Sequence, residues 1–221
     1  MFNKKPEMQK IWIVNVSEHT DNFTKEMLLK KLPESYNKRA NRYLTKEDSM
    51  SYIVGRLLLK KALIQHRFST SLLEEIRYSE HGKPSFINHN FSISHSHWYV
   101  SLIFSTAFSV GIDIEKKKEI DLKLFNYLFT DFEWKYIINA ENSLERFYWL
   151  WVRKEALLKA AGCTLKDLKQ IEVFEHYGTY KGKHYYFESF DFDPDFNGIV
   201  AMETKTAIDV EFVEIKDLLE E

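Results

Sequence analysis

The sequence predicts an α+β protein of two similar subdomains, each an antiparallel sheet packed with helices. Three observations predict this class. A helical segment precedes a run of short strand-like segments, that order returns loosely in the second half, and no linker or low-complexity segment interrupts the chain. The seam is expected near residues 105–112, which gives subdomains 1–106 and 107–221 with a cleft between them.

The first half is expected to contain one long amphipathic helix among its strands. Thr45 is a suitable N-cap because acidic residues follow it in the first turn. Ile53, Leu57 and Leu58 then fall on one face of the helix. The predicted elements are a strand at 11–16, the helix within 44–68, a strand, turn and short extended piece across 75–86 with the turn at His81-Gly82, and strands at 91–96 and 98–115.

The second half is expected to begin with two helices and to continue with strands. Gly162 ends the second helix, because glycine readily adopts the left-handed conformation that follows a helix C-terminus. The predicted elements are helices at 124–140 and 143–162 and strands at 171–176, 183–191, 198–204 and 207–215.

Composition narrows the class of protein. The 221 residues are 44% apolar and 29% charged, as in globular proteins, and the formal net charge of −2 gives no overall basic field for nucleic acid. The single cysteine, Cys163, excludes an internal disulfide and fits a reducing compartment. The N-terminus lacks the apolar core of a signal peptide, and no apolar run reaches the roughly 20 residues of a membrane span. A cytoplasmic protein without a membrane or nucleic-acid partner is expected.

Two carboxylates interrupt the apolar strand VGIDIE at residues 110–115. Asp113 and Glu115 lie on the same face of the strand, where like charges repel and burial is unfavourable unless they are paired. One reading is a solvated edge or ion pairs with Lys116 and Lys117. The other is a divalent-cation site, since hard cations prefer carboxylate oxygens, and Gly111 leaves room for a ligand or another backbone to come close.

A second group of charges lies in the helix WLWVRKEALLKAAG at 149–162. Trp151, Glu155 and Lys159 follow one another at four-residue steps, so they share a face. An ordinary Glu-to-Lys surface pair is one reading. The apolar positions around the pair favour the other, a charged group at the edge of a buried surface.

Three shorter stretches each have an ordinary structural interpretation. FSISHS at 91–96 places His95 on the face of Phe91 and Ile93, where it is either a core residue or a ligand, and three serines on the other face, each able to bond the backbone. HGKPSF at 81–86 is a turn with a lysine. FTDFE at 129–133 reads as a helix start, with Thr130 as cap and Glu133 three residues later.

Taken together and in this order, the five stretches resemble the signature of the 4′-phosphopantetheinyl transferases, in particular the larger pseudodimeric type that activates surfactin and other peptide synthetases. The resemblance covers residues from about 40 to 162, and its defining pair is Gly-Ile-Asp-x-Glu and Trp-x-x-x-Glu-x-x-x-Lys. It implies the pseudo-twofold fold of that family. It also implies transfer of 4′-phosphopantetheine from coenzyme A to a serine of an apo acyl or peptidyl carrier protein, with release of adenosine 3′,5′-bisphosphate.

The resemblance also implies roles for individual residues. Asp113, Glu115 and Glu155 would coordinate Mg²⁺, with Mn²⁺ as an alternative. The general base would be either Glu155 or a metal-bound water. Lys159 would stabilise the phosphate being transferred, and Glu133 would complete or orient the metal site. The expected coenzyme A contacts are His95 on the 3′-phosphate, Ser94 and Lys159 on the phosphates, and Lys83, Pro84 and Ser85 around the adenine.

One part of the family pattern is altered. The usual arginine near the start of the first helix is replaced by Ser51, so the 3′-phosphate needs another basic group. Lys38, Arg39 and Arg42 precede the helix and Arg56 lies within it. Of these, Arg39 and Arg56 are the expected substitutes, with Arg42 as a further contact.

Two other functions share parts of the pattern. A metal-dependent nuclease or phosphodiesterase can use the same residue types, but the chain lacks a basic stripe. A non-catalytic module that binds carrier proteins is the other alternative. A carrier surface is expected on residues 125–137, unless these aromatics fill the core, and its members are Phe125, Leu128, Phe132 and Trp134. A monomer is expected, because one chain supplies both halves of the cleft.

Overall fold

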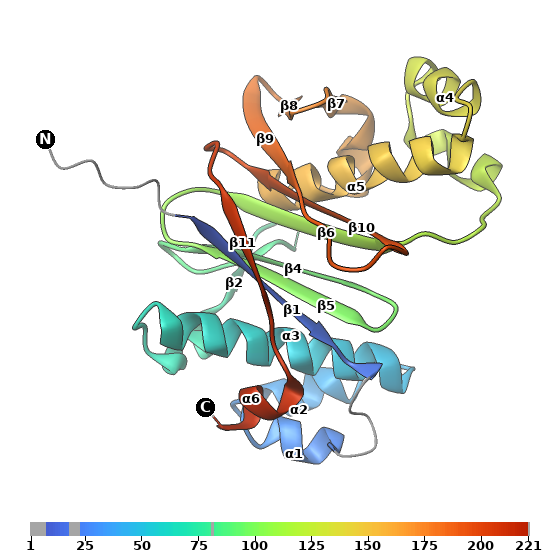
Figure 1. The fold of residues 1–221 in the computed structure, drawn as a ribbon. Helices are drawn as coiled ribbons and strands as arrows, with labels where there is room; N and C mark the ends of the chain where they lie inside the picture. Colours follow the sequence, from blue (N-terminus) through green and yellow to red (C-terminus); the bar gives the residue numbers. More distant parts are fainter. Residues whose placement is uncertain (1–7, 18–22, 81, 221) are drawn as a thin grey trace, which may run out of the picture.

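The computed structural model describes residues 8–17, 23–80 and 82–220. It confirms an α+β fold in which sheets pack against helices (Figure 1). A four-stranded sheet has the order β11-β1-β5-β4, and a five-stranded sheet has the order β6-β10-β9-β8-β7. The pairs are antiparallel except that β1 and β11 run parallel.

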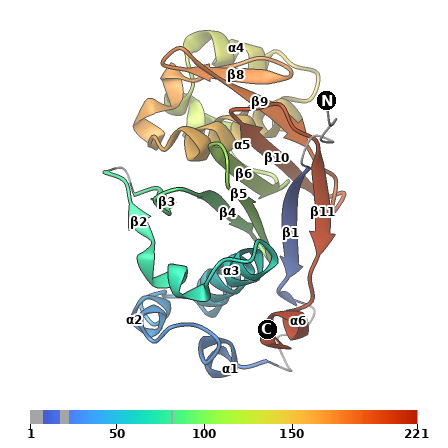
Figure 2. The same cartoon turned by 90° about the vertical axis from the view of Figure 1, so that its left-hand side faces the viewer.

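The first sheet is covered by the long helix α3 (Lys46–Gln65). As predicted, Thr45 caps this helix by accepting a hydrogen bond from the Asp48 backbone N–H, and Ile53, Leu57 and Leu58 are buried. The strands of this sheet are β1 (Gln9–Asn15), β4 (Asn90–Ser96), β5 (Tyr99–Ser105) and β11 (Ile208–Phe212), and shorter helices α1 (Lys25–Leu29), α2 (Ser35–Ala40) and α6 (Ile215–Glu220) lie near α3 (Figures 1 and 2).

The second sheet is covered by helix α5 (Ser143–Ala161). The helix ends at Gly162, which has a φ of 69° and so adopts the left-handed conformation, as predicted. The strands of this sheet are β6 (Val110–Lys116), β7 (Glu172–Val173), β8 (Tyr177–Tyr180), β9 (Lys183–Ser189) and β10 (Phe196–Met202). A separate two-stranded ribbon joins β2 (Arg77–Tyr78) to β3 (Pro84–Ser85).

Helix α5 lies against β6 because the strand carries a glycine at the crossing point. A Cβ atom on Gly111 would come within 2.0 Å of the Ala156 carbonyl oxygen and 2.4 Å of the Ala160 nitrogen. No other residue fits there without moving the helix. The sequence predicted that a ligand or another backbone comes close to Gly111, and the structure shows that it is the backbone of α5. This contact brings α5 beside Asp113.

Several elements differ from those predicted. The expected helix at 124–140 is divided into a 3-10 turn (Leu122–Leu128) and helix α4 (Asp131–Ile138), because Thr130 and Glu133 form a capping box that starts a new helix. Helices α1 and α2, strand β8 and helix α6 were not predicted. The expected turn residue His81 lies outside the described residues.

The last strand returns to the first half of the molecule. Strand β11 pairs with β1, with Ile11 opposite Val210, although it follows the whole second sheet in the chain. A division between residues 106 and 107 therefore separates the two sheets except for β11, which returns to the first sheet. The domain boundary itself stays a prediction. Within the described residues, no helix is both long and apolar enough to cross a membrane.

Candidate active site

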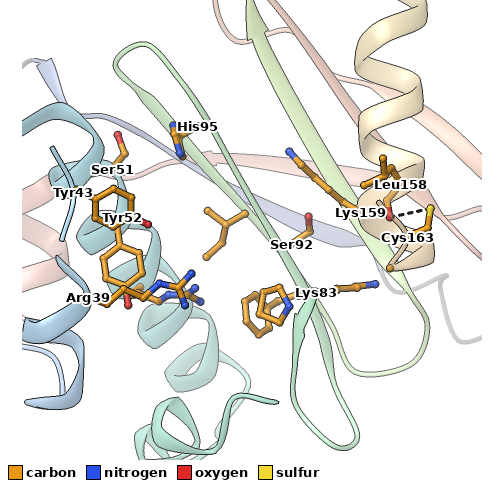
Figure 3. Close-up of a pocket in the computed structure, with 16 residues that line it drawn as sticks. Arg39, Tyr43, Ser51, Tyr52, Lys83, Ser92, His95, Leu158, Lys159 and Cys163 are labelled. Atoms are coloured by element: carbon orange, nitrogen blue, oxygen red, sulfur yellow. Dashed lines mark hydrogen bonds between the residues drawn. The ribbon is translucent and has the colours of Figure 1, made fainter. Parts of the chain in front are cut away.

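A pocket between the two halves is lined by residues of both. Figure 3 shows Arg39, Tyr43 and Tyr52 on one side, Lys159 and Cys163 on the other, and His95 of β4 between them. The sequence-predicted residues that line this pocket are Arg39, Arg56, Lys83, Pro84, His95 and Lys159. Its lining includes neither the predicted coenzyme A contacts Arg42, Ser85 and Ser94 nor the predicted carboxylates Asp113, Glu115, Glu133 and Glu155. Arg42 instead borders a shallow surface hollow beside Arg39.

Arg56 is a buried cation without an acidic partner among the described residues. It is 6% exposed, and its Nε and Nη1 atoms have no hydrogen-bond partner there. Its guanidinium lies over the rings of Tyr52 and Phe91, at 5.4 and 5.8 Å from their centroids. Aromatic faces attract a cation but do not accept its N–H groups in the way that an anion does. The arrangement favours an anionic ligand at this end of the pocket.

Arg39 stands beside Arg56 on the same aromatic surface. Its guanidinium lies over Tyr52 and Tyr78, and it donates a hydrogen bond of 2.7 Å to the Tyr78 hydroxyl. The two arginines therefore share Tyr52, which comes directly after Ser51. Sequence reasoning missed Tyr52, although its position beside the missing arginine was a usable signal.

Lys83 connects the first half of the chain to the end of helix α5. Its ammonium donates a 2.6 Å hydrogen bond to the Ala160 carbonyl oxygen, one of the unpaired carbonyls at the helix C-terminus. Burial lowers the pKa of Lys83 to about 8. The sequence predicts that the backbone of Lys83 contacts the adenine. The side-chain hydrogen bond to Ala160 neither supports nor contradicts that prediction.

His95 points toward the pocket from β4 (Figure 3). Desolvation by the surrounding protein, and then the nearby Lys159 ammonium, lower the pKa of its imidazole. The structural reading of His95 as a core residue is wrong, because this residue is exposed and lines the pocket.

Asp113 is 3% exposed and forms an ion pair with Lys159 of α5. The Lys159 Nζ to Asp113 Oδ1 distance is 2.7 Å, and the Ser94 hydroxyl donates to the same oxygen at 2.9 Å. Burial raises the pKa of Asp113, and the ammonium and hydroxyl offset part of that rise. The other oxygen, Oδ2, is buried without a hydrogen-bond partner among the described residues.

Glu115 and Glu155 complete an acidic group around Asp113. Glu115 accepts hydrogen bonds from the Trp151 indole N–H (3.1 Å) and the Ser96 hydroxyl (3.1 Å). Burial, and then the charge of Asp113, raise the pKa of Glu115. The same two causes raise the pKa of Glu155 to about 7. The predicted reading of the helix as the edge of a buried charged group fits this arrangement.

The acidic group is not a preformed metal cage. The described part of the chain holds no cluster of three or more His, Cys, Asp or Glu side chains arranged to bind a metal ion. The donor chemistry nevertheless fits a divalent cation, because three carboxylates interact and the buried Oδ2 of Asp113 is unpartnered. In this arrangement the Lys159 ammonium supplies the positive charge next to Asp113.

Glu133 is engaged elsewhere. One of its oxygens accepts from the Thr130 backbone and hydroxyl, and the other forms a 2.6 Å ion pair with Lys154. Lys154 is fully buried and also donates to the carbonyls of Leu168 and Ile171. Glu133 thus holds α4 to α5, the helix that carries Glu155. This contact was missed because one sequence gives no sign of which acid a buried lysine will meet.

The three serines of β4 do what the structural reading of FSISHS allows. Their hydroxyls accept backbone N–H groups of the neighbouring strand β6. Because Ser94 directs its only proton at Asp113, a phosphate would have to replace that bond to receive it. The phosphate contact implied for Ser94 therefore stays a prediction.

Comparisons with known proteins agree with the resemblance in the sequence. The family model of the 4′-phosphopantetheinyl transferase superfamily matches residues 109–202. The chain is 34% identical over 152 residues to 4′-phosphopantetheinyl transferase gsp of Aneurinibacillus migulanus, covering 66% of this chain and 61% of the relative. It is 32% identical over 138 residues to 4′-phosphopantetheinyl transferase Sfp of Bacillus subtilis (strain 168), covering 59% of each.

A third relative comes from another bacterial group. Over 128 residues the chain is 32% identical to 4′-phosphopantetheinyl transferase AcpT of Escherichia coli (strain K12), covering 55% of this chain and 65% of the relative. These matches thus span about three fifths of the length of the curated relatives. The family match includes the strand of Asp113 and Glu115 and the helix of Glu155 and Lys159, so the similarity to the 4′-phosphopantetheinyl transferase superfamily over residues 109–202 covers the acidic group.

Proposed function

We propose that this protein transfers the 4′-phosphopantetheine group of coenzyme A to a serine of an apo acyl or peptidyl carrier protein. The observation that supports the proposal is that one side of the site has excess positive charge and the other side has excess negative charge. A buried guanidinium without an acid lines the pocket, and carboxylates in excess of their lysine lie beside it. Coenzyme A with a divalent cation supplies both missing charges, phosphate for the arginine and metal for the acids.

Arg56 and Arg39 are the proposed clamp for the 3′-phosphate. They would take over from the family arginine that Ser51 replaces, because both side chains border the pocket and Arg56 Nε and Nη1 have no hydrogen-bond partner in the part of the chain that the structure describes. A phosphate accepts several such bonds at once. His95 provides a further contact on the phosphates, and the pocket lining at Lys83 and Pro84 provides the adenine side.

Asp113, Glu115 and Glu155 are the proposed ligands of Mg²⁺, with Mn²⁺ as an alternative. When bound, the cation neutralises the charge of the carboxylates and of the coenzyme A diphosphate. Lys159, which donates to Asp113 and Ser94, would have the phosphate as a third partner, and its ammonium would stabilise the negative charge that develops there. Glu155 is the proposed acceptor of the proton that the carrier serine hydroxyl loses as its oxygen bonds to the phosphorus and adenosine 3′,5′-bisphosphate leaves.

The carrier surface is proposed on the segment before α5. Phe132 is 80% exposed, whereas Phe125, Leu128 and Trp134 are partly buried against the cluster around Phe147. Of the four expected contacts, Phe132 is therefore the one most available to a partner. Leu124 and Tyr127 of the same segment are also exposed. A Phe132 substitution that weakens carrier binding but leaves coenzyme A binding unchanged would support this carrier surface.

The proposal includes a cytoplasmic location and a monomeric enzyme. Both sides of the pocket come from one chain, so the site needs no second copy. The one cysteine, Cys163, is a buried free thiol, as expected in a reducing compartment. The nuclease alternative has less support, because the formal net charge of −2 gives no overall basic field for a nucleic acid.

The mass of a carrier protein tests the proposal. The protein is incubated with coenzyme A, Mg²⁺ and a panel of apo carriers, each of which is then weighed by mass spectrometry. A gain of one phosphopantetheine group on at least one carrier is expected. Nucleic-acid cleavage without any carrier modification would support the nuclease instead, and carrier binding without a mass gain would support a non-catalytic module.

A further inference from the structure

Strands β4 and β6 lie side by side although they belong to different sheets (Figure 1). Between them, three serine hydroxyls of β4 accept backbone N–H groups of β6: Ser92 from Ile112 (3.1 Å), Ser94 from Ile114 (3.3 Å) and Ser96 from Lys116 (3.0 Å). Both members of each pair advance by two residues, so the strands run in the same direction. We call these three serines the hydroxyl ladder.

The hydroxyl ladder also contacts the acidic group. A hydroxyl has one proton to donate and two lone pairs that accept. Ser96 accepts the Lys116 N–H and donates to Glu115 Oε2 at 3.1 Å. Ser94 accepts the Ile114 N–H and donates to Asp113 Oδ1 at 2.9 Å. The same atoms that join the two sheets therefore also fix the direction of two carboxylates.

Ser96 gives the clearer case of the two. Ser94 additionally accepts a 2.9 Å hydrogen bond from Lys159, so its loss would disturb the ion pair as well as Asp113. The polar contacts of Ser96 are the Lys116 N–H and Glu115, and Glu115 is held from its other oxygen by the Trp151 indole. Without the hydroxyl, Glu115 keeps only one of its two anchors.

We propose that Ser96 is a positioning residue for the transfer reaction, holding the Glu115 carboxylate from strand β4 while it joins β4 to β6. The inference rests on the proposed function, since Glu115 acts there as a ligand of the divalent cation. Residues that orient a metal-binding side chain commonly change metal affinity or activity by about 10- to 100-fold when they are replaced. Ser96 acts only through Glu115 and need not touch coenzyme A.

The experiment measures Mg²⁺-dependent coenzyme A binding by calorimetry and the Mg²⁺ concentration that gives half the maximal transfer rate. Ser96→Ala is compared with Ser96→Thr, which keeps a hydroxyl, and with Ser101→Ala as a matched control. Ser101 is a buried serine of β5 whose hydroxyl donates to the Ser94 carbonyl and touches no carboxylate among the described residues. Ser96→Ala is expected to raise the half-saturating Mg²⁺ concentration roughly tenfold. Ser96→Thr should keep the half-saturating Mg²⁺ concentration close to that of the wild type, and Ser101→Ala should lower only thermal stability.

A double-mutant cycle with Glu115→Gln separates positioning from general stability. If Ser96 acts through Glu115, Ser96→Ala has little further effect on Mg²⁺ dependence once Glu115 is replaced. An undiminished effect in that background would overturn the inference, as would a Ser96→Ala protein that behaves like Ser101→Ala. Wild-type protein that neither transfers nor binds coenzyme A in a Mg²⁺-dependent way would overturn the proposed function together with the inference.

Discussion

Helices α3 and α5 each cover one sheet, but they leave opposite charges without a partner. From α3 comes Arg56, a buried guanidinium whose Nε and Nη1 have no hydrogen-bond partner among the described residues. From α5 comes Glu155, whose pKa rises to about 7 because it is buried beside other carboxylates. Both arrangements cost stability, since burying a charged group without a partner destabilises a fold. A ligand that is anionic at one end and binds a cation at the other removes both costs.

The two helices also differ in how closely they approach their sheets. A Cβ on Gly111 of β6 would meet the backbone of α5 at 2.0 Å, whereas a Cβ on Gly55 of α3 would meet the Ile93 side chain at 3.1 Å. A side chain can yield by a few tenths of an ångström, but a helix backbone cannot do so alone.

The largest effect is therefore expected from Gly111→Ala. This change should lower the free energy of unfolding by about 3 kcal/mol or more, because α5 must move as a unit. Gly55→Ala should change stability by no more than about 1 kcal/mol, since the gain in helix propensity offsets the tight contact. Chemical denaturation measures both. Equal effects of the two substitutions would show that the helices pack alike and would remove this difference between them.

The next effect concerns the acidic side. Asp113→Asn keeps the size of the side chain but removes its charge, so transfer should fall roughly 100-fold or more, in line with the several kcal/mol that a bound metal supplies. Thermal unfolding should change little, because the amide can still bond Ser94. Carrier modification at a rate near that of the wild type would show that Asp113 is not part of the metal site.

On the cationic side, Arg56→Met should weaken coenzyme A binding by about 10- to 100-fold, the loss of a charge-assisted contact of about 1.5–3 kcal/mol. The unliganded protein should not lose stability, because the substitution removes an uncompensated buried charge. Dephospho-coenzyme A, which lacks the 3′-phosphate, is the control. If Arg56→Met weakens binding of both nucleotides equally, the arginine does not bind the 3′-phosphate.

The smallest effect concerns Lys83, which links the two sides. Burial lowers its pKa from 10.5 to about 8, so between these pH values the unfolded chain holds more protons on this lysine than the folded protein does. Stability therefore gains a contribution that rises with pH across that window and is smallest below pH 8. Between pH 8 and 10.5, Lys83→Met should reduce the slope of the unfolding free energy against pH by up to the amount that corresponds to one bound proton. Identical slopes in the two proteins would mean that Lys83 titrates normally.

Much of the fold followed from local patterns in the sequence. The cap at Thr45, the stop at Gly162 and the apolar face of α3 depend on residues near one another in the chain, so a single sequence reveals them. The break before α4 was harder to place. Apolar residues continue through 124–140, and only the capping box at Thr130 and Glu133 divides the segment.

Contacts between distant residues could not be predicted in the same way. Strand β11 reads as a strand, but nothing in its pattern indicates that it pairs with β1. The candidate site shows the same limit: its residue types were visible in the sequence, whereas the Lys159–Asp113 ion pair and the hydroxyl ladder depend on which strands and helices become neighbours. The motif resemblance named the candidate residues, and only the fold shows which contacts they make.

A titration of coenzyme A into the protein, with and without Mg²⁺, tests the central claim most directly. The account predicts that Mg²⁺ strengthens binding, that Asp113→Asn removes this gain, and that Arg56→Met weakens binding by a similar factor whether or not Mg²⁺ is present. Binding that is indifferent to Mg²⁺ and to both substitutions would contradict the account, because the unpaired charges on the two sides of the site would then have no part in holding the nucleotide.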